Sequence, residues 1–186
     1  MVQKYDNITF EIILVLIREK KHIRGIAKNI GTSHNTVLRQ LNQLEKEGIV
    51  DYKKEGRNKI FFLKKNLKSR KLVYMAEQYK QLKLYNKYPK LEVIFNEIIN
   101  KAKGIIILFG SYAKFRAKEQ SDIDIYIETK DKKIKEGIES INSKISVKIG
   151  EFDTESLLIK EIINNHVIIE GVNKFYEKVR FFEEDT

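Results

Sequence analysis

The sequence predicts an α+β protein built from two modules. In the first part, apolar residues recur at helical spacing and two short strand-like runs follow them. The second part alternates between helical patterns and short apolar runs. We expect a first module over residues 1–67, a connecting helix over residues 68–88 and a second module over residues 89–186. The single proline, Pro89, lies at the last boundary, because proline cannot continue a helix.

Composition limits the classes of protein that this chain can be. It has 186 residues, of which 42% are hydrophobic, enough for packed cores. It has no cysteine, which excludes disulfides and cysteine-ligated zinc. It has no run of about 18 apolar residues and no N-terminal apolar stretch of the signal-peptide type. We therefore expect a cytoplasmic protein with no membrane partner.

The net charge of +10 is distributed unevenly. Residues 1–90 hold 21 Lys and Arg against 8 Asp and Glu, whereas residues 91–186 hold 15 against 18. A basic first half favours a polyanionic partner. A soluble basic surface without a partner is the alternative, so the pattern beneath the charge has to decide between them.

The first module has the pattern of a helix-turn-helix followed by a hairpin. Apolar positions predict helices over residues 10–17 and 23–29. Gly31 can end the second helix in the left-handed conformation, and Ser33 can cap a third helix that runs to Gly48.

Two strands are predicted after the third helix, over residues 49–52 and 59–63, with a turn over residues 55–58. Three helices and a basic hairpin in this order, over residues 6–66, resemble the winged helix-turn-helix domains of prokaryotic transcription regulators. The resemblance implies that duplex DNA is a partner and that the third helix enters the major groove. A winged helix used for protein contacts is the alternative.

The residues expected to contact DNA lie on the third helix and on the hairpin. Asn, Gln and Arg can pair with base edges, and Lys and Arg on the hairpin would meet phosphates or the minor groove. They are Ser33, His34, Asn35, Thr36, Arg39, Gln40 and Gln43 on the helix, and Lys53, Lys54, Arg57 and Lys59 on the hairpin.

The connecting helix carries a narrow apolar stripe of Leu72, Met75, Tyr79 and Leu82. This stripe predicts either a seam between two copies in a homodimer or packing on its own domain. After Pro89, a second amphipathic helix is expected, with Leu91, Val93 or Ile94, Phe95, Ile98 and Ile99 on its buried face.

The most informative stretch of the second module begins at Gly110-Ser111. The pair follows the apolar run of residues 105–109. Ser121 comes ten residues after Ser111 and is followed by Asp122 and Asp124 at the start of another strand. Alternate strand residues share a face, so the two carboxylates lie about 7 Å apart. Two such carboxylates can hold Mg²⁺, and the Gly-Ser turn offers N–H groups to phosphates.

This stretch, from Gly110 through Arg116 and Ala117 to Ser121-Asp122-Ile123-Asp124, resembles the signature of the DNA polymerase β-like nucleotidyltransferases, and most of all the minimal nucleotidyltransferases of archaea and bacteria. The resemblance implies an α/β domain with a mixed sheet flanked by helices. It also implies Asp122 and Asp124 as catalytic residues and metal ligands, Gly110, Ser111 and Ser121 as nucleotide-binding residues, and Mg²⁺ and an NTP, with ATP the expected one, as cofactor and substrate.

The chain departs from this family at two places. Family members often have Arg-Gly where this chain has Lys114-Phe115, and phenylalanine adopts a positive φ less easily than glycine. Active members usually supply a third carboxylate from a neighbouring strand. The candidate strand, residues 145–149, has Ser146 and Lys148 where an acid is expected, and a lysine would oppose a cation. Glu151 either substitutes for this acid or is a surface turn residue.

The C-terminal part is expected to hold a helix over residues 154–164 capped by Thr154, a strand over residues 167–170 and a last helix beyond Gly171. This ending also resembles that of minimal nucleotidyltransferases. His166, in the turn before the strand, is either a catalytic residue or a polar cap.

Three functions fit these patterns. The first is a DNA-binding regulator whose second domain transfers NMP from Mg-NTP to a protein acceptor. The family resemblance suggests an antitoxin acting on a HEPN-type toxin as the setting. The second is a catalytically silent regulator that binds a nucleotide or a protein. The third is an enzyme that modifies tRNA or another polynucleotide.

Overall fold

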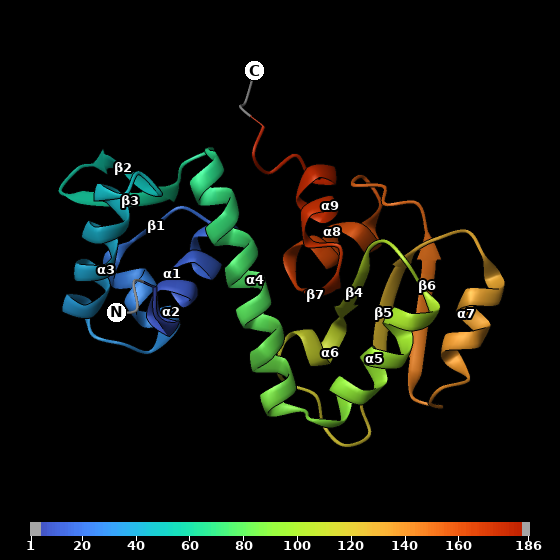
Figure 1. Ribbon diagram of the computed structural model, residues 1–186. Coiled ribbons are helices and arrows are strands. Elements are labelled where there is room, and N and C mark those ends of the chain that lie inside the picture. The colour runs from blue at the N-terminus through green and yellow to red at the C-terminus, as the bar shows by residue number, and fades with distance from the viewer. Residues whose placement is uncertain (1–4, 184–186) are drawn as a thin grey trace. The chain divides into compact units, whose positions relative to one another are not determined.

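The computed structural model describes residues 5–183, which form two compact units (Figure 1). The first unit comprises the described residues up to Tyr79 together with residues 182–183, and the second runs from Lys80 to Phe181. Within the described range, no helix is both long enough and apolar enough to cross a membrane. The units are divided within one helix, α4 (Leu67–Lys87), rather than at either of its ends.

The first unit has three helices, a three-stranded antiparallel sheet and the start of α4. The sheet has the order β1-β3-β2. The strand β1 has only two residues, too few to show an alternating pattern in the sequence. The elements are α1 (Asn7–Arg18), β1 (Lys21–His22), α2 (Ile23–Ile30), α3 (His34–Lys46), β2 (Val50–Glu55) and β3 (Asn58–Leu63).

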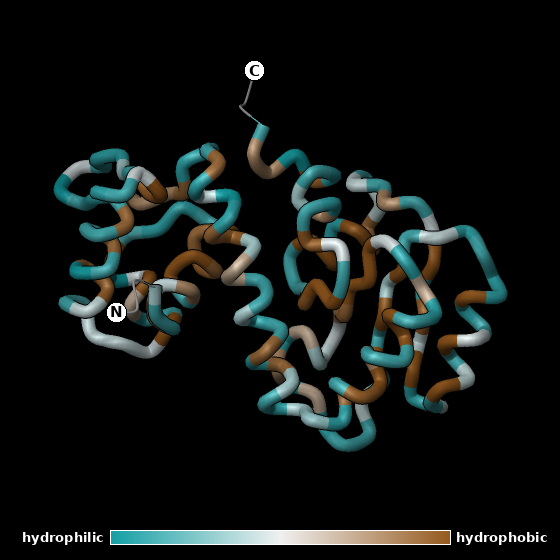
Figure 2. Tube along the Cα trace, in the orientation of Figure 1, coloured by the Kyte–Doolittle hydropathy of each residue, from teal (hydrophilic) through white to brown (hydrophobic). Residues whose placement is uncertain are grey.

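The helix ends of the first unit are set by the residues that the sequence singled out. Gly31 has φ +68° and ends α2. Ser33 caps α3, its hydroxyl accepting from the N–H of Thr36. These two ends fix the turn between α2 and α3, and Asp6 caps α1 in the same way through Thr9. Figure 2 shows hydrophobic stretches along these helices that alternate with hydrophilic ones.

One expected surface residue of α3 is buried instead. Gln40 is 8% exposed, its Nε2 donates to Asp6 Oδ2 at 3.0 Å, and its Oε1 accepts from the hydroxyl of Thr9 at 3.3 Å. It follows Arg39, which is exposed, by one helical step of 100°. Gln40 therefore ties α3 to the start of α1, and the expectation that it faces DNA is wrong.

The apolar stripe expected on α4 is rotated from the observed one. Leu72 is buried, but Met75 and Leu82 are 44% and 62% exposed. The buried apolar positions are Leu72, Val73, Ala76 and Leu84. Each end of α4 thus contributes to the core of its own unit, and a homodimer through the stripe stays a prediction.

The second unit is a four-stranded mixed sheet of order β6-β5-β4-β7 (Figure 1). β4 is antiparallel to both β5 and β7, and β5 is parallel to β6, as the fold class predicted. The strands are β4 (Ile106–Phe109), β5 (Ile123–Glu128), β6 (Ile145–Gly150) and β7 (Val167–Glu170). The helices are α5 (Lys90–Lys101), α6 (Gly110–Ala113), α7 (Lys132–Glu139), α8 (Leu157–Asn164) and α9 (Val172–Lys178).

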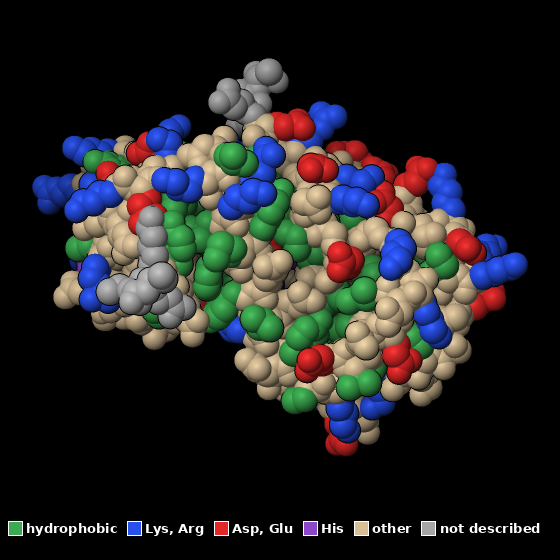
Figure 3. All heavy atoms as spheres, in the orientation of Figure 1, with side chains coloured by type: hydrophobic (Ala, Val, Ile, Leu, Met, Phe, Trp, Pro, Cys, Tyr) green, Lys and Arg blue, Asp and Glu red, His purple; other side chains and the backbone are tan. Residues whose placement is uncertain are grey.

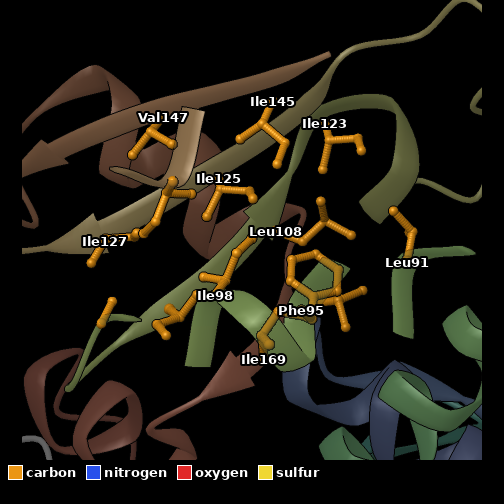
Figure 4. Close-up of a cluster of buried hydrophobic side chains, with 14 of the residues drawn as sticks. Leu91, Phe95, Ile98, Leu108, Ile123, Ile125, Ile127, Ile145, Val147 and Ile169 are labelled. Atoms are coloured by element: carbon orange, nitrogen blue, oxygen red, sulfur yellow. The ribbon is translucent and has the colours of Figure 1, made fainter. Parts of the chain in front are cut away.

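One face of this sheet packs on α5 and α7. Figure 4 shows Ile123, Ile125 and Ile127 leaving β5 on the same side, toward Phe95 and Ile98 of α5. Val93 is 65% exposed and Ile94 packs against the cluster, so the second of the two predicted positions is the core one. The alternation along β5 sends Asp124 and Tyr126 to the other face.

The C-terminal elements differ from expectation in detail. α8 begins later than predicted, because its cap is Ser156, whose hydroxyl accepts from the N–H of Ile159, and not Thr154. His166 is buried, and its Nδ1 donates to the carbonyl oxygen of Ile162 at 2.8 Å. The imidazole therefore caps the end of α8, and the cap interpretation of this residue fits the structure.

Candidate functional site

The site is organised by a glycine at the junction of β4 and α6. Gly110 has φ +71°, a backbone conformation that residues other than glycine rarely adopt. Its neighbour Phe109 pairs in register with Asp124 on β5. A Cβ atom on Gly110 would lie 2.3 Å from Asp124 Oδ2. The turn that begins α6 is therefore pressed directly against a carboxylate, and glycine is needed both for its φ and for its lack of a side chain.

The two predicted carboxylates act on each other electrostatically. Asp124 is half-buried, and Asp122 is exposed just before β5. Burial raises the pKa of Asp124, and the negative charge of Asp122 raises it further. A cation between or beside the two carboxylates would relieve this repulsion.

Two further charged residues act on Asp124. Lys148 on β6 lowers the pKa of Asp124, and Glu161 on α8 raises it. The carboxylate of Glu161 lies 3.3 Å from the Nζ of Lys114, which follows α6. Glu161 could not be predicted from sequence reasoning, because it is 37 residues from Asp124 and no short motif links them.

A third carboxylate is missing where the family resemblance implies one. Ser146 pairs in register with Asp124, and Lys148 pairs with Tyr126. Gly150, next to Glu151, pairs with Glu128 at the far end of β5, so Glu151 cannot replace the missing acid. Glu151 forms an exposed ion pair with Lys130, which lowers its pKa. Across residues 5–183, no three or more His, Cys, Asp or Glu side chains are grouped to hold a metal.

The loop between α6 and β5 is held by local hydrogen bonds. Ser121 Oγ accepts from the N–H of Lys118 at 2.9 Å, so this hydroxyl supports the loop. Ser111 is half-buried at the start of α6. Phe115 adopts φ +55°, the left-handed conformation that glycine would adopt at less cost. The chain thus reaches this turn geometry despite the substitution.

The candidate DNA-contacting residues are mostly on the surface of the first unit. His34, Asn35 and Arg39 of α3 are exposed. Thr36 and Gln43 are half-buried, and the amide of Gln43 donates to Glu47 Oε1 at 3.2 Å. Ser33 is exposed, and its hydroxyl is engaged in the cap.

The hairpin of β2 and β3 presents four exposed cations, Lys53, Lys54, Arg57 and Lys59. Lys and Arg side chains gather at the left edge of the first unit in Figure 3, where this hairpin lies. The Nζ of Lys59 lies 3.7 Å from the ring centre of Tyr52, a cation–π contact that orients it. The hairpin therefore has the basic, exposed character that phosphate contacts require.

Two family models match the chain, one on each unit. Residues 9–52 match the bacterial regulatory proteins of the arsR family, and residues 90–174 match the polymerase β nucleotidyltransferase family. The chain therefore joins a winged helix-turn-helix of the regulator type to a nucleotidyltransferase-family domain. The search of curated proteins gave no match.

Two solved structures show weaker similarity to the chain. One is the adhesin competence repressor AdcR from Streptococcus pyogenes, at 16% identity and a TM-score of 0.39, covering 55% of this chain and 71% of that one. The other is a toxin-antitoxin with AMP-PNP, at 19% identity and a TM-score of 0.37, covering 48% of this chain and 83% of that one. Both TM-scores are too low to support a functional argument.

The raised pKa of Asp124 predicts how the stability of the protein depends on pH. This pKa is raised in the folded state, so ionisation of Asp124 costs stability as the pH rises from the ordinary aspartate pKa of 3.8 through the folded-state pKa. We expect Asp124→Asn to raise the free energy of unfolding at pH 7 by about 0.5 kcal/mol, a small amount because solvent screens the site. The gain should vanish at low pH.

Urea unfolding at pH 7 and at low pH measures this difference in metal-free buffer. Glu136→Gln is the control, because Glu136 is exposed on α7, away from the two carboxylates. A loss of stability in Asp124→Asn at pH 7, with the control unchanged, would contradict the electrostatic account of the site.

Proposed function

We propose that the protein is a DNA-binding regulator whose second domain transfers a nucleoside monophosphate from an NTP to a hydroxyl of a protein acceptor. The single observation that carries the enzymatic part is the contact of Gly110 with Asp124, beside Asp122. It places a turn of phosphate-binding type against a pair of carboxylates that repel each other. A metal-bound triphosphate supplies what both features need, which are a cation for the acids and oxygens for the turn.

The donor set suits a metal ion that arrives with its nucleotide. Mg²⁺ is commonly bound by one or two carboxylates together with substrate phosphates, rather than by a cage of protein ligands. Asp122 and Asp124 would hold it, and it would supply charge neutralisation at the phosphates. Two acids without a third fit this mode, because the remaining ligands come from the substrate and water.

The residues of the chain would act by positioning and by charge. The backbone of Gly110 and Ser111 would bind the β- and γ-phosphates. The acceptor oxygen forms a bond to the α-phosphorus while the bond from that phosphorus to the bridging oxygen of the β-phosphate breaks. Pyrophosphate leaves, and the acceptor proton passes to solvent. Lys114 follows α6 and pairs with Glu161. It would contact a phosphate of the bound nucleotide once this ion pair opens.

The proposal can be tested by label transfer from α-labelled NTPs with Mg²⁺ or Mn²⁺. The protein is incubated alone, with extract of its source and with tRNA. We expect label on a protein, from wild type only and not from the Asp122→Asn/Asp124→Asn double variant. Label on tRNA instead would support the polynucleotide-modifying alternative. No label under any condition would contradict nucleotidyl transfer.

A silent second domain is the competing function, and the cation Lys148 favours it. Lys148 acts on Asp124 from the strand that should carry an acid. Ser146→Asp places an acid beside Asp124, so it should strengthen Mn²⁺ binding measured by calorimetry if only a ligand is missing. Ser140→Asp, at the exposed end of α7, is the control. Equal Mn²⁺ affinity in both variants would favour a domain whose site no longer serves a metal.

The regulatory part of the proposal rests on the exposed cations of the hairpin and on α3. The partner toxin and the homodimer remain expectations from the family resemblance. An antitoxin that both represses its own gene and modifies its toxin would use both units of this chain. Such a protein would need a promoter-binding surface and a transferase site at different places, and the surface and site proposed here lie in different units.

If the first unit binds DNA, substitutions on the hairpin and on α3 should change the affinity for DNA in different ways. Removing two phosphate contacts with Lys53→Ala/Arg57→Ala should weaken binding on all sequences and lower the slope of log affinity against log salt by about 2. Arg39→Ala should cost about 1–3 kcal/mol on a selected site and much less on random duplex. Fluorescence anisotropy over a salt series measures both, and Lys132→Ala on α7 is the control. Unchanged affinity in all three variants would contradict DNA binding through this surface.

A further inference from the structure

The second unit holds a cavity on the side of the sheet opposite the two carboxylates. It has a volume of about 560 Å³, within the range of small-molecule sites. Its lining comes from the α4–α5 junction, α6, the loop before β5 and the loop before β6. Ile123 lines the cavity and belongs to the core beneath α5, whereas Asp124, the next residue, points to the other face. The cavity is therefore distinct from the site described above.

The lining combines an aromatic and apolar wall with a basic rim. Tyr88 and Tyr112 meet edge to face, with ring centres 4.9 Å apart, and Leu91 and Ile94 extend the apolar wall. The Oη of Tyr88 is buried and has no hydrogen-bond partner among the described residues.

Three lysines, Lys90, Lys118 and Lys144, lie on the rim, against one acid, Glu119. All three lysines are exposed, and the Nζ of Lys144 is held by the carbonyl oxygen of Glu119. Flat rings stack on aromatic side chains, and anions pair with lysine ammonium groups. Asn142 and Ser143 add side-chain donors and acceptors at the same rim.

We propose that this cavity binds a small planar organic anion of the size of a mononucleotide. The ring packs against the wall formed by Tyr88, Tyr112, Leu91 and Ile94, and the anionic group meets the lysines. The loop that carries Ala117, Lys118 and Glu119 continues into Ser121 and Asp122. A ligand in the cavity would therefore contact the loop that leads into Asp122.

The test uses an AMP derivative with a fluorescent N-methylanthraniloyl group, in EDTA so that no metal supports binding at the carboxylates. Saturable binding is expected for wild type and, with equal affinity, for Asp122→Asn/Asp124→Asn. Ala117→Phe fills the cavity and Lys118→Glu reverses a rim charge. Each should weaken binding at least about tenfold, whereas Lys103→Glu, an exposed lysine outside the cavity, should not.

Three results would overturn this proposal. They are no saturable binding up to about 1 mM, binding that is lost with the two aspartates, and binding that neither cavity variant changes. Because Lys118→Glu leaves the core untouched, it keeps the test valid if Ala117→Phe fails to fold. The outcome is independent of the label-transfer experiment, since EDTA and the aspartate variant remove nucleotidyl transfer from the measurement.

Discussion

The contact between Gly110 and Asp124 is the constraint on which the second unit depends. A left-handed glycine lets the chain leave β4 and enter α6 without a side chain, and the space left is taken by a carboxylate of β5. The register of β4 with β5, which pairs Phe109 with Asp124, puts the two together. Asp124 is half-buried and is repelled by Asp122, which costs free energy. The apolar packing of the opposite face of the sheet on α5 and α7 offsets that cost. The same alternation that buries Ile123 and Ile125 places Asp124 on the opposite face of the sheet.

The charges around this contact favour the binding of a cation beside Asp124. Asp122 and Glu161 raise the pKa of Asp124, and Lys148 alone lowers it. A family member with a third acid would bind metal more firmly before substrate arrives. This chain instead has Ser146 at the paired position, so the proposed metal would take its remaining ligands from phosphate oxygens and water. The first unit differs from the second, because its hairpin cations are exposed on a surface and are not gathered around a half-buried group.

Much of this could be read from the sequence because local chemistry determines it. Gly31, Ser33 and Gly110 occupy positions where a left-handed φ or a helix cap admits few residue types, so short motifs revealed them. Gln40 could not be placed, because its burial depends on Asp6 and Thr9 of another helix. Glu161 was missed for the same reason, as only the fold brings α8 near Asp124. Helical spacing on α4 identified its period but not which positions the single chain buries, since Met75 and Leu82 are exposed on it.

The most direct test of the central claim is Mg-ATP binding to Gly110→Ala, measured by calorimetry beside wild type. The added methyl group would meet Asp124 Oδ2 and would be strained at φ +71°. Gly137→Ala is the control, because that glycine lies in α7 with open space around its Cβ position. We predict that wild type and the control bind alike and that Gly110→Ala loses binding while its circular dichroism shows a folded chain. Wild-type affinity in Gly110→Ala would contradict the claim that this contact forms the nucleotide site.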